Sequence, residues 1–347
     1  MTPRPCISRL CRPCRRVAGL AGLGLAALPV LAQSWAQSAL DPAGPQARQL
    51  AVLSWWMFGI AAAVLAGVTL LVLWAVLRGR RGAQDRPLGT RRGLWVVVGG
   101  GVLLPLVSAI ALLGASLAVG RETSGPGPGG ALVVEVTGHR WWWEAHYLDP
   151  QGLRVATVAN ELHVPVGRPV RVLLKSEDVI HSFWAPNLQG KTDMVPGRTN
   201  VAWFQAEREG TWRGQCAEFC GLQHAMMAFL IVAEPPARFE AWLQRQAQPA
   251  AEPADALARQ GRQLFESRAC VMCHAVRGTV AAGQVAPDLT HLASRRTLAA
   301  GRLPNNRGSL AAWIVDPQQV KPGTTMPPTR LSGDELHALL HYLEGLR

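Results

Sequence analysis

Charged residues are scarce in this chain. Only 17% of its 347 residues are Asp, Glu, Lys or Arg, whereas 49% are hydrophobic. In soluble globular domains about 25% of the residues are charged. The shortage therefore indicates a membrane protein with soluble parts rather than a wholly soluble protein.

Acidic residues are the scarcer of the charged residues, with 23 Asp and Glu against 35 Lys and Arg, a net charge of +12. Such an excess can indicate nucleic-acid binding. Here much of it lies in two short runs beside apolar segments, within residues 1–16 and 78–93, while segment 131–234 is near neutral. Basic flanks of apolar helices are a topology signal. We therefore expect no nucleic-acid partner.

Two long runs lack charge altogether, residues 51–77 and 94–120. Each is longer than the roughly 20 residues that cross a bilayer core. Neither has a polar face, which argues against buried core helices. We expect two transmembrane helices, with the Arg-rich loop 78–93 cytoplasmic by the positive-inside rule and everything after Gly120 outside.

The N-terminus has the pattern of a secretory signal, with basic residues before the apolar run 17–32. We expect residues 1–38 to be a cleaved signal peptide, with cleavage after Ala32 or Ser38. Three cysteines fall within it: Cys6, Cys11 and Cys14.

Few cysteines remain in the mature chain, and they form two tight pairs, Cys216 with Cys220 and Cys270 with Cys273. A His lies near each pair and a Met follows. That arrangement indicates cofactor chemistry rather than a disulfide framework.

Short strands separated by turn residues predict a small β-sandwich or barrel over 131–234. A short helix and linker are expected over 235–254, and a helical domain over 255–347. The expected strands are 132–136, 170–174, 201–204 and 229–232, and the expected helices are 237–246, 255–268, 309–315 and 333–345.

The first candidate site places two thiols, an imidazole and a thioether within twelve residues: Cys216, Cys220, His224 and Met227. Soft sulfur with imidazole suits copper. A type-1 copper site uses one Cys, whereas two can bridge a pair of coppers, each of which needs its own imidazole. His181 is the candidate for the second. A structural zinc or a disulfide is the alternative, but zinc would not call for Met227.

The second candidate site is Cys270-Val-Met-Cys273-His274, the CxxCH pattern of c-type haem attachment. A distal ligand is also needed, and Pro322-Gly-Thr-Thr-Met326-Pro-Pro resembles the Met loop of class I cytochromes c, which makes Met326 the expected one. His/Met ligation raises the haem potential, which suits electron transfer. Met272 is a poorer candidate because it is tied beside the proximal His. Alternative distal ligands are His291, His337 and His341.

Three stretches resemble subunit II of haem–copper cytochrome c oxidases: CAEFCGLQHAMM (216–227), EDVIHSFWAPNLQGKTDMVPGR (177–198) and GHRWWWE (138–144). The Met326 loop and 286–289 resemble class I cytochromes c. Together they resemble the caa3-type branch. The resemblance implies a two-helix transmembrane hairpin, an all-β cupredoxin-like Greek-key sandwich and an all-α class I cytochrome c domain.

The resemblance also implies the cofactors and their ligands. A binuclear copper centre, CuA, would be held by the side chains of His181, Cys216, Cys220, His224 and Met227 and by the backbone carbonyl of Glu218. The Glu218 side chain would reach a magnesium ion shared with subunit I. Trp141 would receive electrons from cytochrome c. One haem c would be attached through Cys270 and Cys273 and ligated by His274 and Met326, and the carbonyl of Pro287 would hold the proximal imidazole.

By the same resemblance, electrons pass from haem c to CuA and on to subunit I, where O₂ is reduced to water with proton pumping. The implied partners are subunits I and III, the membrane, and an external donor such as a cytochrome c or the cytochrome bc1 complex. The implied location is the bacterial plasma membrane, spanned twice, with both soluble domains on the periplasmic side.

One departure and three alternatives remain. Many relatives carry a glutamate near the start of the second helix that opens a proton path, but residues 91–95 hold no carboxylate, which puts that proton entry in doubt. A quinol oxidase subunit II would lack the copper ligands. A membrane-anchored copper chaperone would explain neither Met227 nor the haem motif. Nitrous oxide reductase needs a large catalytic domain.

Overall fold

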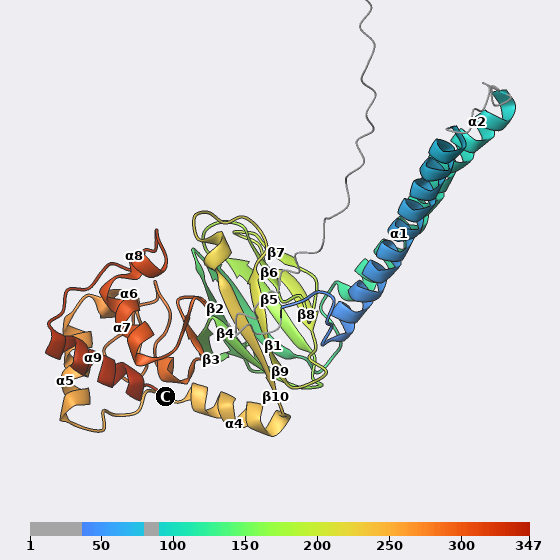
Figure 1. Ribbon diagram of the computed structural model, residues 1–347. Coiled ribbons are helices and arrows are strands. Elements are labelled where there is room, and N and C mark those ends of the chain that lie inside the picture. Colours follow the sequence, from blue (N-terminus) through green and yellow to red (C-terminus); the bar gives the residue numbers. More distant parts are fainter. Residues whose placement is uncertain (1–36, 80–89) are drawn as a thin grey trace, which may run out of the picture. The chain divides into compact units, whose positions relative to one another are not determined.

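The computed structural model describes residues 37–79 and 90–347, which all fall within one compact unit. Along the chain come apolar helices, a β-sandwich and a helical domain (Figure 1). Nearly all of the expected signal peptide and most of the expected cytoplasmic loop lie outside the described residues. Those two expectations therefore stay predictions.

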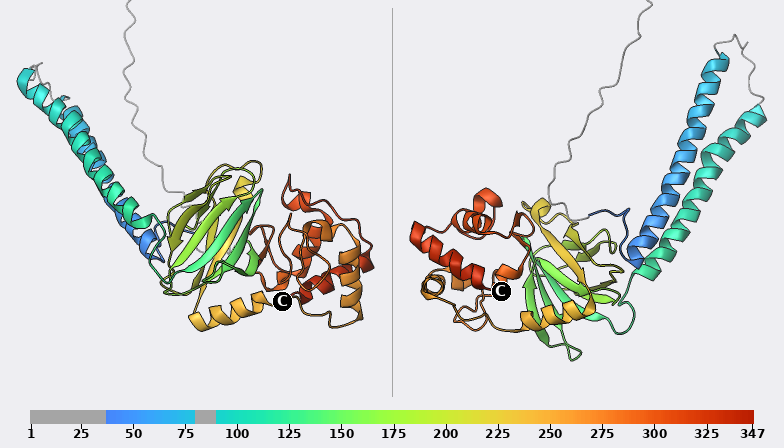
Figure 2. Two further views of the ribbon diagram at one scale, coloured as in Figure 1. Left: turned by 180° about the vertical axis from the view of Figure 1, so that it is seen from behind. Right: turned by 60° about the horizontal axis from the view of Figure 1, so that its bottom comes forward.

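The apolar segments form helices long enough to cross a membrane, over Pro45–Arg78 and Gly93–Thr123. Helices α1 (Pro45–Gly79) and α3 (Leu104–Thr123) run beside each other (Figure 2). None of the residues in their most apolar stretches is buried within the protein. Side chains so apolar need a lipid environment, which fits a membrane hairpin.

Composition alone suggests one continuous second helix, but the structure interrupts it. It begins as α2 (Thr90–Val98), widens into a π-helical turn at Gly99–Leu103 and continues as α3. Pro105 has no N–H to donate to the preceding turn, and three consecutive glycines at 99–101 let the backbone adopt the wider turn.

Ten strands form two five-stranded sheets, in the orders β3-β2-β1-β5-β8 and β4-β10-β9-β6-β7. We call them the sandwich. Most neighbours are antiparallel, but β1 pairs with β5 and β4 with β10 in parallel. The strands are β1 (Leu132–His139), β2 (Trp142–Leu148), β3 (Arg154–Ala159), β4 (Glu161–Pro165), β5 (Val170–Ser176), β6 (His181–Trp184), β7 (Thr192–Met194), β8 (Asn200–Phe204), β9 (Gly210–Cys216) and β10 (Ala228–Glu234).

The four expected strands correspond to β1, β5, β8 and β10. Strands β1 and β5 alternate buried and half-buried residues, the pattern of a strand with one face on a core. Strand β4 shows no alternation because all five of its residues are buried. Helix α4 (Pro236–Ala247) contacts β3 and β4 from outside, which explains why β4 escaped prediction.

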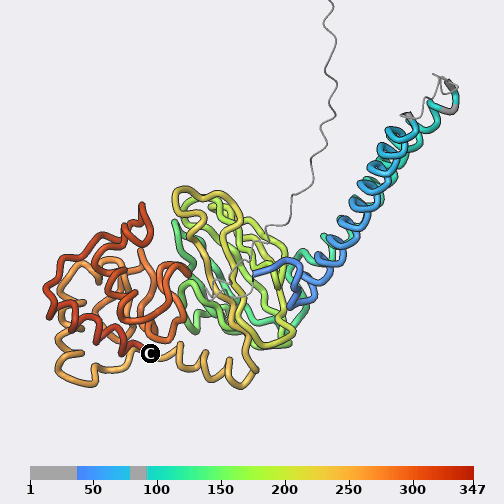
Figure 3. The backbone as a smooth tube through the Cα atoms, viewed as in Figure 1, coloured from blue at the N-terminus to red at the C-terminus, as the bar shows by residue number. Residues whose placement is uncertain are grey.

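The helical domain comprises the residues from 255 to the C-terminus (orange to red in Figure 3). Its longest helices, α5 and α9, cross closely: a Cβ on Gly261 would lie 2.0 Å from the carbonyl oxygen of Ala338. Its helices are α5 (Ala256–Ser267), α6 (Cys270–Cys273), α7 (Arg307–Val315), α8 (Pro317–Val320) and α9 (Gly333–Gly345), with a small pair β11 (Thr297–Leu298) and β12 (Leu303–Pro304).

The end of α4 and the first residues of the linker after it are hydrogen-bonded to the helical domain. The Arg277 guanidinium donates to the carbonyls of Gln246 and Ala247. The Ala250 N–H donates to the Arg277 carbonyl at 2.9 Å, and His291 Nε2 lies 3.1 Å from the Gln248 carbonyl. Composition alone suggests a flexible connection here, but these contacts fix it to the domain that follows.

Candidate copper and haem sites

The sandwich brings together the ligand candidates that lie far apart in the sequence. Strand β6 begins at His181 and strand β9 ends at Cys216. The two strands pair antiparallel, with Phe183 opposite Cys216. The loop after β9 then carries Cys220 and His224 before Met227 leads into β10. Backbone pairing thus closes the 35-residue gap between His181 and Cys216.

The side chains of these residues converge on the Cys216–Cys220 pair. The two Sγ atoms are 3.7 Å apart. Nδ1 of His181 lies 3.8 Å from Cys216 Sγ, and Nδ1 of His224 lies 3.7 Å from Cys220 Sγ. Met227 Sδ lies 3.9 Å from Cys220 Sγ, and the Glu218 carbonyl oxygen lies 3.1 Å from Cys216 Sγ.

These separations fit shared metal coordination and do not fit a disulfide. Two ligand atoms bound tetrahedrally to one ion at 2.0–2.3 Å lie about 3.3–3.8 Å apart. A disulfide would need its sulfurs about 2.05 Å apart, and both cysteines are free. His181, Cys216 and Cys220 form a cluster that could hold a metal ion, with all ligand atoms within 4.8 Å of one another. The donors fit a soft metal such as copper.

The thiol pair is poised to lose a proton. The hydrogen bond from Cys220, with a further one from His181, lowers the pKa of Cys216 to about 3. The thiolate formed at Cys216 in turn raises the pKa of Cys220. A metal would bind both sulfurs as thiolates and release protons. Cys216 is therefore ready as a ligand at neutral pH, and Cys220 would release its proton to solvent when a metal binds.

Neighbouring residues fix the His181 ring. Its Nε2 lies 2.9 Å from Oδ1 of Asp178, which leaves Nδ1 directed at Cys216. Such an outer carboxylate orients a ligating imidazole. A Cβ on Gly138 would lie 2.8 Å from His181 Cδ2, so only glycine leaves room for the ring. Our sequence reading did not single out Asp178, although it lies three residues before His181.

Glu218 contributes in two directions. Its backbone carbonyl faces Cys216, whereas its half-exposed carboxylate lies 3.0 Å from the Lys191 ammonium. The backbone carbonyl of Glu218 thus faces the cysteine pair, and its carboxylate forms an ion pair away from it. The expected roles toward copper and magnesium stay predictions.

The three consecutive tryptophans lie in three different surroundings. Trp143 is fully buried and packs edge-on against Phe183 and Phe229. Trp142 stacks on His139, with ring centroids 4.3 Å apart. Trp141 turns to the candidate copper loop, where its Nε1 donates to the Cys220 carbonyl at 2.9 Å. Only Trp141 of the three hydrogen-bonds to a residue of the Cys pair.

Gly221 permits that contact. Its φ is +109°, and a Cβ there would lie 3.2 Å from the Trp141 ring. A larger residue would meet both backbone strain and crowding at this position.

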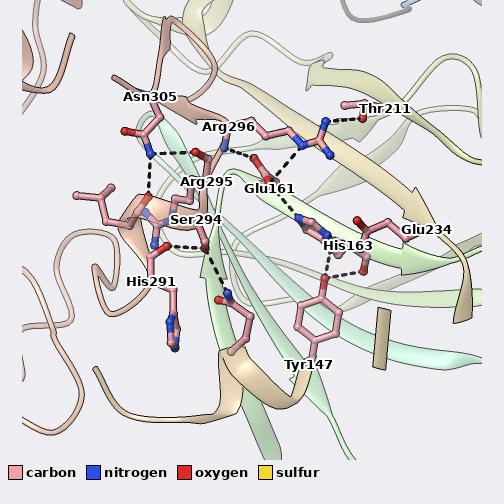
Figure 4. Close-up of polar contacts among 12 residues, drawn as sticks. Tyr147, Glu161, His163, Thr211, Glu234, His291, Ser294, Arg295, Arg296 and Asn305 are labelled. Carbon is pink, nitrogen blue, oxygen red and sulfur yellow. Dashed lines mark hydrogen bonds and ion pairs between the residues drawn. The ribbon is translucent and has the colours of Figure 1, made fainter. Parts of the chain in front are cut away.

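Two further histidines of the sandwich, His146 and His163, are buried and have polar partners. Nε2 of His146 lies 3.3 Å from the Glu144 carboxylate. His163 lies between two carboxylates, with Nε2 2.9 Å from Glu161 and Nδ1 3.1 Å from Glu234 (Figure 4). They are not surface residues.

In the helical domain, α6 consists of the four residues from Cys270 to Cys273, and His274 ends it. Nδ1 of His274 lies 2.7 Å from the Pro287 carbonyl, which accepts its proton and leaves Nε2 free as a ligand. A Cβ on Gly283 would lie 2.5 Å from the Cys273 backbone, so this segment lies directly over the motif. The arrangement fits a c-type haem with His274 as a ligand.

The candidates for the distal haem ligand differ in their burial and in their hydrogen-bond partners. Met272 is 73% exposed, whereas Met326 packs against the domain core, as Cys270 does. Among the alternatives, Nε2 of His291 contacts the Gln248 carbonyl, and Nε2 of His341 lies 2.9 Å from Asp255. His337 is exposed on α9. The surroundings favour Met326.

The two domains also contact each other, which no sequence pattern predicted. Lys321 Nζ donates to the Trp141 carbonyl at 2.8 Å, and Gln223 Nε2 donates to the carbonyls of Lys321 and Pro322. A second contact joins the Arg296 N–H to Glu161 at 2.9 Å (Figure 4). Such pairs depend on tertiary structure alone and leave no local signal.

Comparisons with known proteins agree with both domains. Residues 144–234 match the family model for the periplasmic domain of cytochrome c oxidase subunit II, and residues 258–347 match the model for cytochrome c. The first finding places the sandwich outside the membrane and the second identifies the helical domain. The expected fold class is thereby confirmed.

Two individual relatives are similar to this chain over more than half of its length. Cytochrome c oxidase subunit 2 of Alkalihalophilus pseudofirmus is 36% identical over 321 residues, covering 89% of this chain and 91% of the relative. That of Bacillus subtilis is 35% identical over 227 residues, covering 62% of this chain and 63% of the relative.

Among solved structures, the periplasmic domain of cytochrome oxidase subunit II of Bradyrhizobium japonicum is 32% identical. It has a TM-score of 0.32 and covers 34% of this chain and 95% of its own. Since one relative at 36% identity spans most of both chains, the chain belongs to the cytochrome c oxidase subunit II family and carries a cytochrome c domain after its periplasmic domain.

Proposed function

We propose that this chain relays electrons from a covalently bound haem c to a binuclear copper centre and on to subunit I of a haem–copper cytochrome c oxidase. There, O₂ would be reduced to water with proton pumping. When bound, the haem and the copper centre each supply a one-electron redox couple. The chain itself holds and orients them.

The observation that carries the proposal is the convergence of imidazole, thiol and thioether groups on two cysteine sulfurs 3.7 Å apart. His181 contacts one sulfur, and His224 and Met227 contact the other. One imidazole for each sulfur suits two metals bridged by both thiolates. A structural zinc would need no thioether.

The sandwich holds the proposed copper ligands rigidly and shields them from water. The two Cys, His181 and Met227 are all buried. Asp178 orients His181, and the strand pairing of β6 with β9 fixes the spacing of ligands that lie far apart in the sequence. A rigid ligand set limits rearrangement when the charge changes, which favours fast electron transfer.

For the haem we propose attachment through Cys270 and Cys273, with His274 and Met326 as ligands. The Pro287 carbonyl accepts a hydrogen bond from Nδ1 of His274. This bond fixes the imidazole ring and directs Nε2 away from the carbonyl. Trp141 would connect the copper loop to an electron donor through its bond to Cys220.

The membrane part follows from the same assignment. We propose that the hairpin spans the bacterial plasma membrane with loop 78–93 in the cytoplasm, and that both domains lie on the periplasmic side. Subunits I and III would contact the helices. The carboxylate of Glu218 would meet subunit I at a shared magnesium ion, and an external cytochrome c or the cytochrome bc1 complex would supply electrons.

Metal analysis and spectroscopy of the purified chain test the proposal. We expect two coppers and one haem per chain, with an EPR signal shared equally by both coppers. Cys216→Ser removes one bridge, so the shared signal should collapse while the haem spectrum stays. A single copper with an ordinary four-line signal in the unmodified chain would contradict the assignment.

A further inference from the structure

The segment just before Met326 lies directly on the candidate copper loop. Gln223, next to His224, donates from Nε2 to the carbonyls of Lys321 at 3.1 Å and Pro322 at 3.0 Å. A Cβ on Gly323 would lie 2.4 Å from the end of the Leu222 side chain, and its φ of +84° favours glycine at this approach. The two domains are therefore in contact beside a proposed ligand of each cofactor.

Lys321 is unusual in this contact because its charge is buried. It is 4% exposed, and burial lowers the pKa of its ammonium to about 8. Its Nζ donates to the Trp141 carbonyl at 2.8 Å, and no carboxylate in the described part of the chain pairs with it. A buried, unpaired ammonium is costly, whereas an apolar side chain would fill the position at a lower cost.

The contact leads to the copper ligands by two routes. In the first route, Lys321 hydrogen-bonds to the Trp141 carbonyl, and the Trp141 indole N–H hydrogen-bonds to the Cys220 carbonyl. In the second route, Gln223 hydrogen-bonds to the carbonyls of Lys321 and Pro322 and is joined to His224 by one peptide bond. Hydrogen bonds and covalent bonds thus join the segment before Met326 to both Cys220 and His224.

A second contact joins the helical domain to strands β4, β9 and β10 of the sandwich. The Arg296 N–H donates to Glu161, and its guanidinium donates to Thr211 at 3.1 Å (Figure 4). The Ala228 N–H donates to the Ala300 carbonyl at 3.1 Å. Because Ala228 follows Met227 directly, this second contact should keep the domain attached when the first contact is lost.

We propose that Lys321 and Gln223 are positioning residues that hold the Met326 segment against the copper loop and thereby set the rate of internal electron transfer. They touch neither cofactor ligand side chain directly and act through Trp141 and the backbone. The inference rests on the proposed relay between haem and copper.

The test uses the assembled oxidase with the variants Lys321→Met and Gln223→Leu, which remove the donors at similar volume. The haem is reduced by a flash, and electron arrival at copper is followed by absorbance. We expect the rate to fall about tenfold in each variant, as loss of a buried hydrogen bond would give. Haem and copper potentials and the copper EPR signal should stay unchanged.

Lys175→Gln is the matched control, because it removes a lysine of β5 whose ammonium hydrogen-bonds to Glu135 of β1 and not to the helical domain. Its rate should equal that of the unmodified chain. Unmodified rates in both variants would overturn the inference. So would a slower rate with an altered copper EPR signal, because the residue would then shape the centre itself. If Lys321→Met does not assemble, Gln223→Leu decides alone. If the unmodified chain shows no haem-to-copper transfer, the proposed function fails instead.

Discussion

The two candidate sites differ in how far the protein alone completes them. In the sandwich, His181, Cys216, Cys220 and Met227 are 0–4% exposed and form part of, or lie against, one continuous core. In the helical domain, the ligand candidates are only half-buried: Cys270, Cys273, His274 and Met326. The comparison teaches that the proposed copper ligands, apart from the half-buried His224, are held by the core of the sandwich. The haem ligand candidates lie at the margin of the helical core, where a bound haem would cover them.

Removal of the haem should give the largest effect. In a Cys270→Ala, Cys273→Ala double variant, we expect the amide protection of α5 and α9 to fall roughly a hundredfold or more, about 2.7 kcal/mol, because a tightly bound group stabilises the folded state. The strands of the sandwich should keep their protection. Hydrogen exchange measures both in one sample, and retained protection in α9 would contradict the contrast.

A substitution that adds a methyl group beside His181 tests how rigidly the sandwich holds the proposed copper ligands. Gly138→Ala places a Cβ 2.8 Å from the His181 ring, so the ring or the strand must move, at a cost of about 1–3 kcal/mol. Thermal unfolding and copper content should both fall. Gly129→Ala is the control, since nothing lies within 4 Å of its Cβ. Full copper loading in Gly138→Ala would show that the site is looser than we describe.

Loss of the outer carboxylate should have a smaller effect. Asp178→Asn keeps an acceptor near His181 Nε2 but removes the charge, so copper affinity should fall about tenfold. Competition with a copper chelator measures the change. An unchanged affinity would mean that the strands alone orient the ring.

The smallest effect concerns the contact between the domains. Burial alone would lower the pKa of His163, but hydrogen bonds to Glu161 and Glu234 outweigh it, and the pKa is raised above 6.5. Both ring nitrogens face carboxylates, so both carry protons. The ring also stacks on Trp242, and Tyr147 holds its backbone. Arg296 shares Glu161, and Arg238 lies near enough to Glu234 to lower its pKa.

Because the folded-state pKa of His163 is raised, its contribution to stability is complete below about pH 6.5 and is lost as pH rises through the folded value. We expect about 1 kcal/mol. Thermal unfolding of the unmodified chain and of His163→Gln, compared from about pH 6 upward, should converge as pH rises. A gap that stays constant over that range would rule out this linkage.

The sequence predicted what is local and could not predict what is tertiary. Cys216, Cys220, His224 and Met227 lie within one short stretch, so their spacing alone indicates copper. In strands β1 and β5, buried and half-buried residues alternate, whereas β4 is buried on both faces and has no such alternation. The membrane helices follow from length and apolarity, but the π-turn at Gly99–Leu103 depends on how Pro105 is accommodated.

The contact between the domains left no trace in the sequence. Lys321 and Gln223 are separated by nearly a hundred residues and belong to no motif. The linker has the composition of a flexible connection, yet Arg277 and His291 bind its backbone. Only the folded chain shows that the haem-bearing domain is docked rather than loosely tethered.

Flash reduction of the haem in the assembled oxidase, with copper reduction followed at several dilutions, tests the central claim most directly. We predict that the electron reaches copper with a rate that does not change on dilution and depends only weakly on salt, because both sites belong to one docked chain. A rate that scales with concentration, or a haem that stays reduced while copper stays oxidised, would contradict the relay.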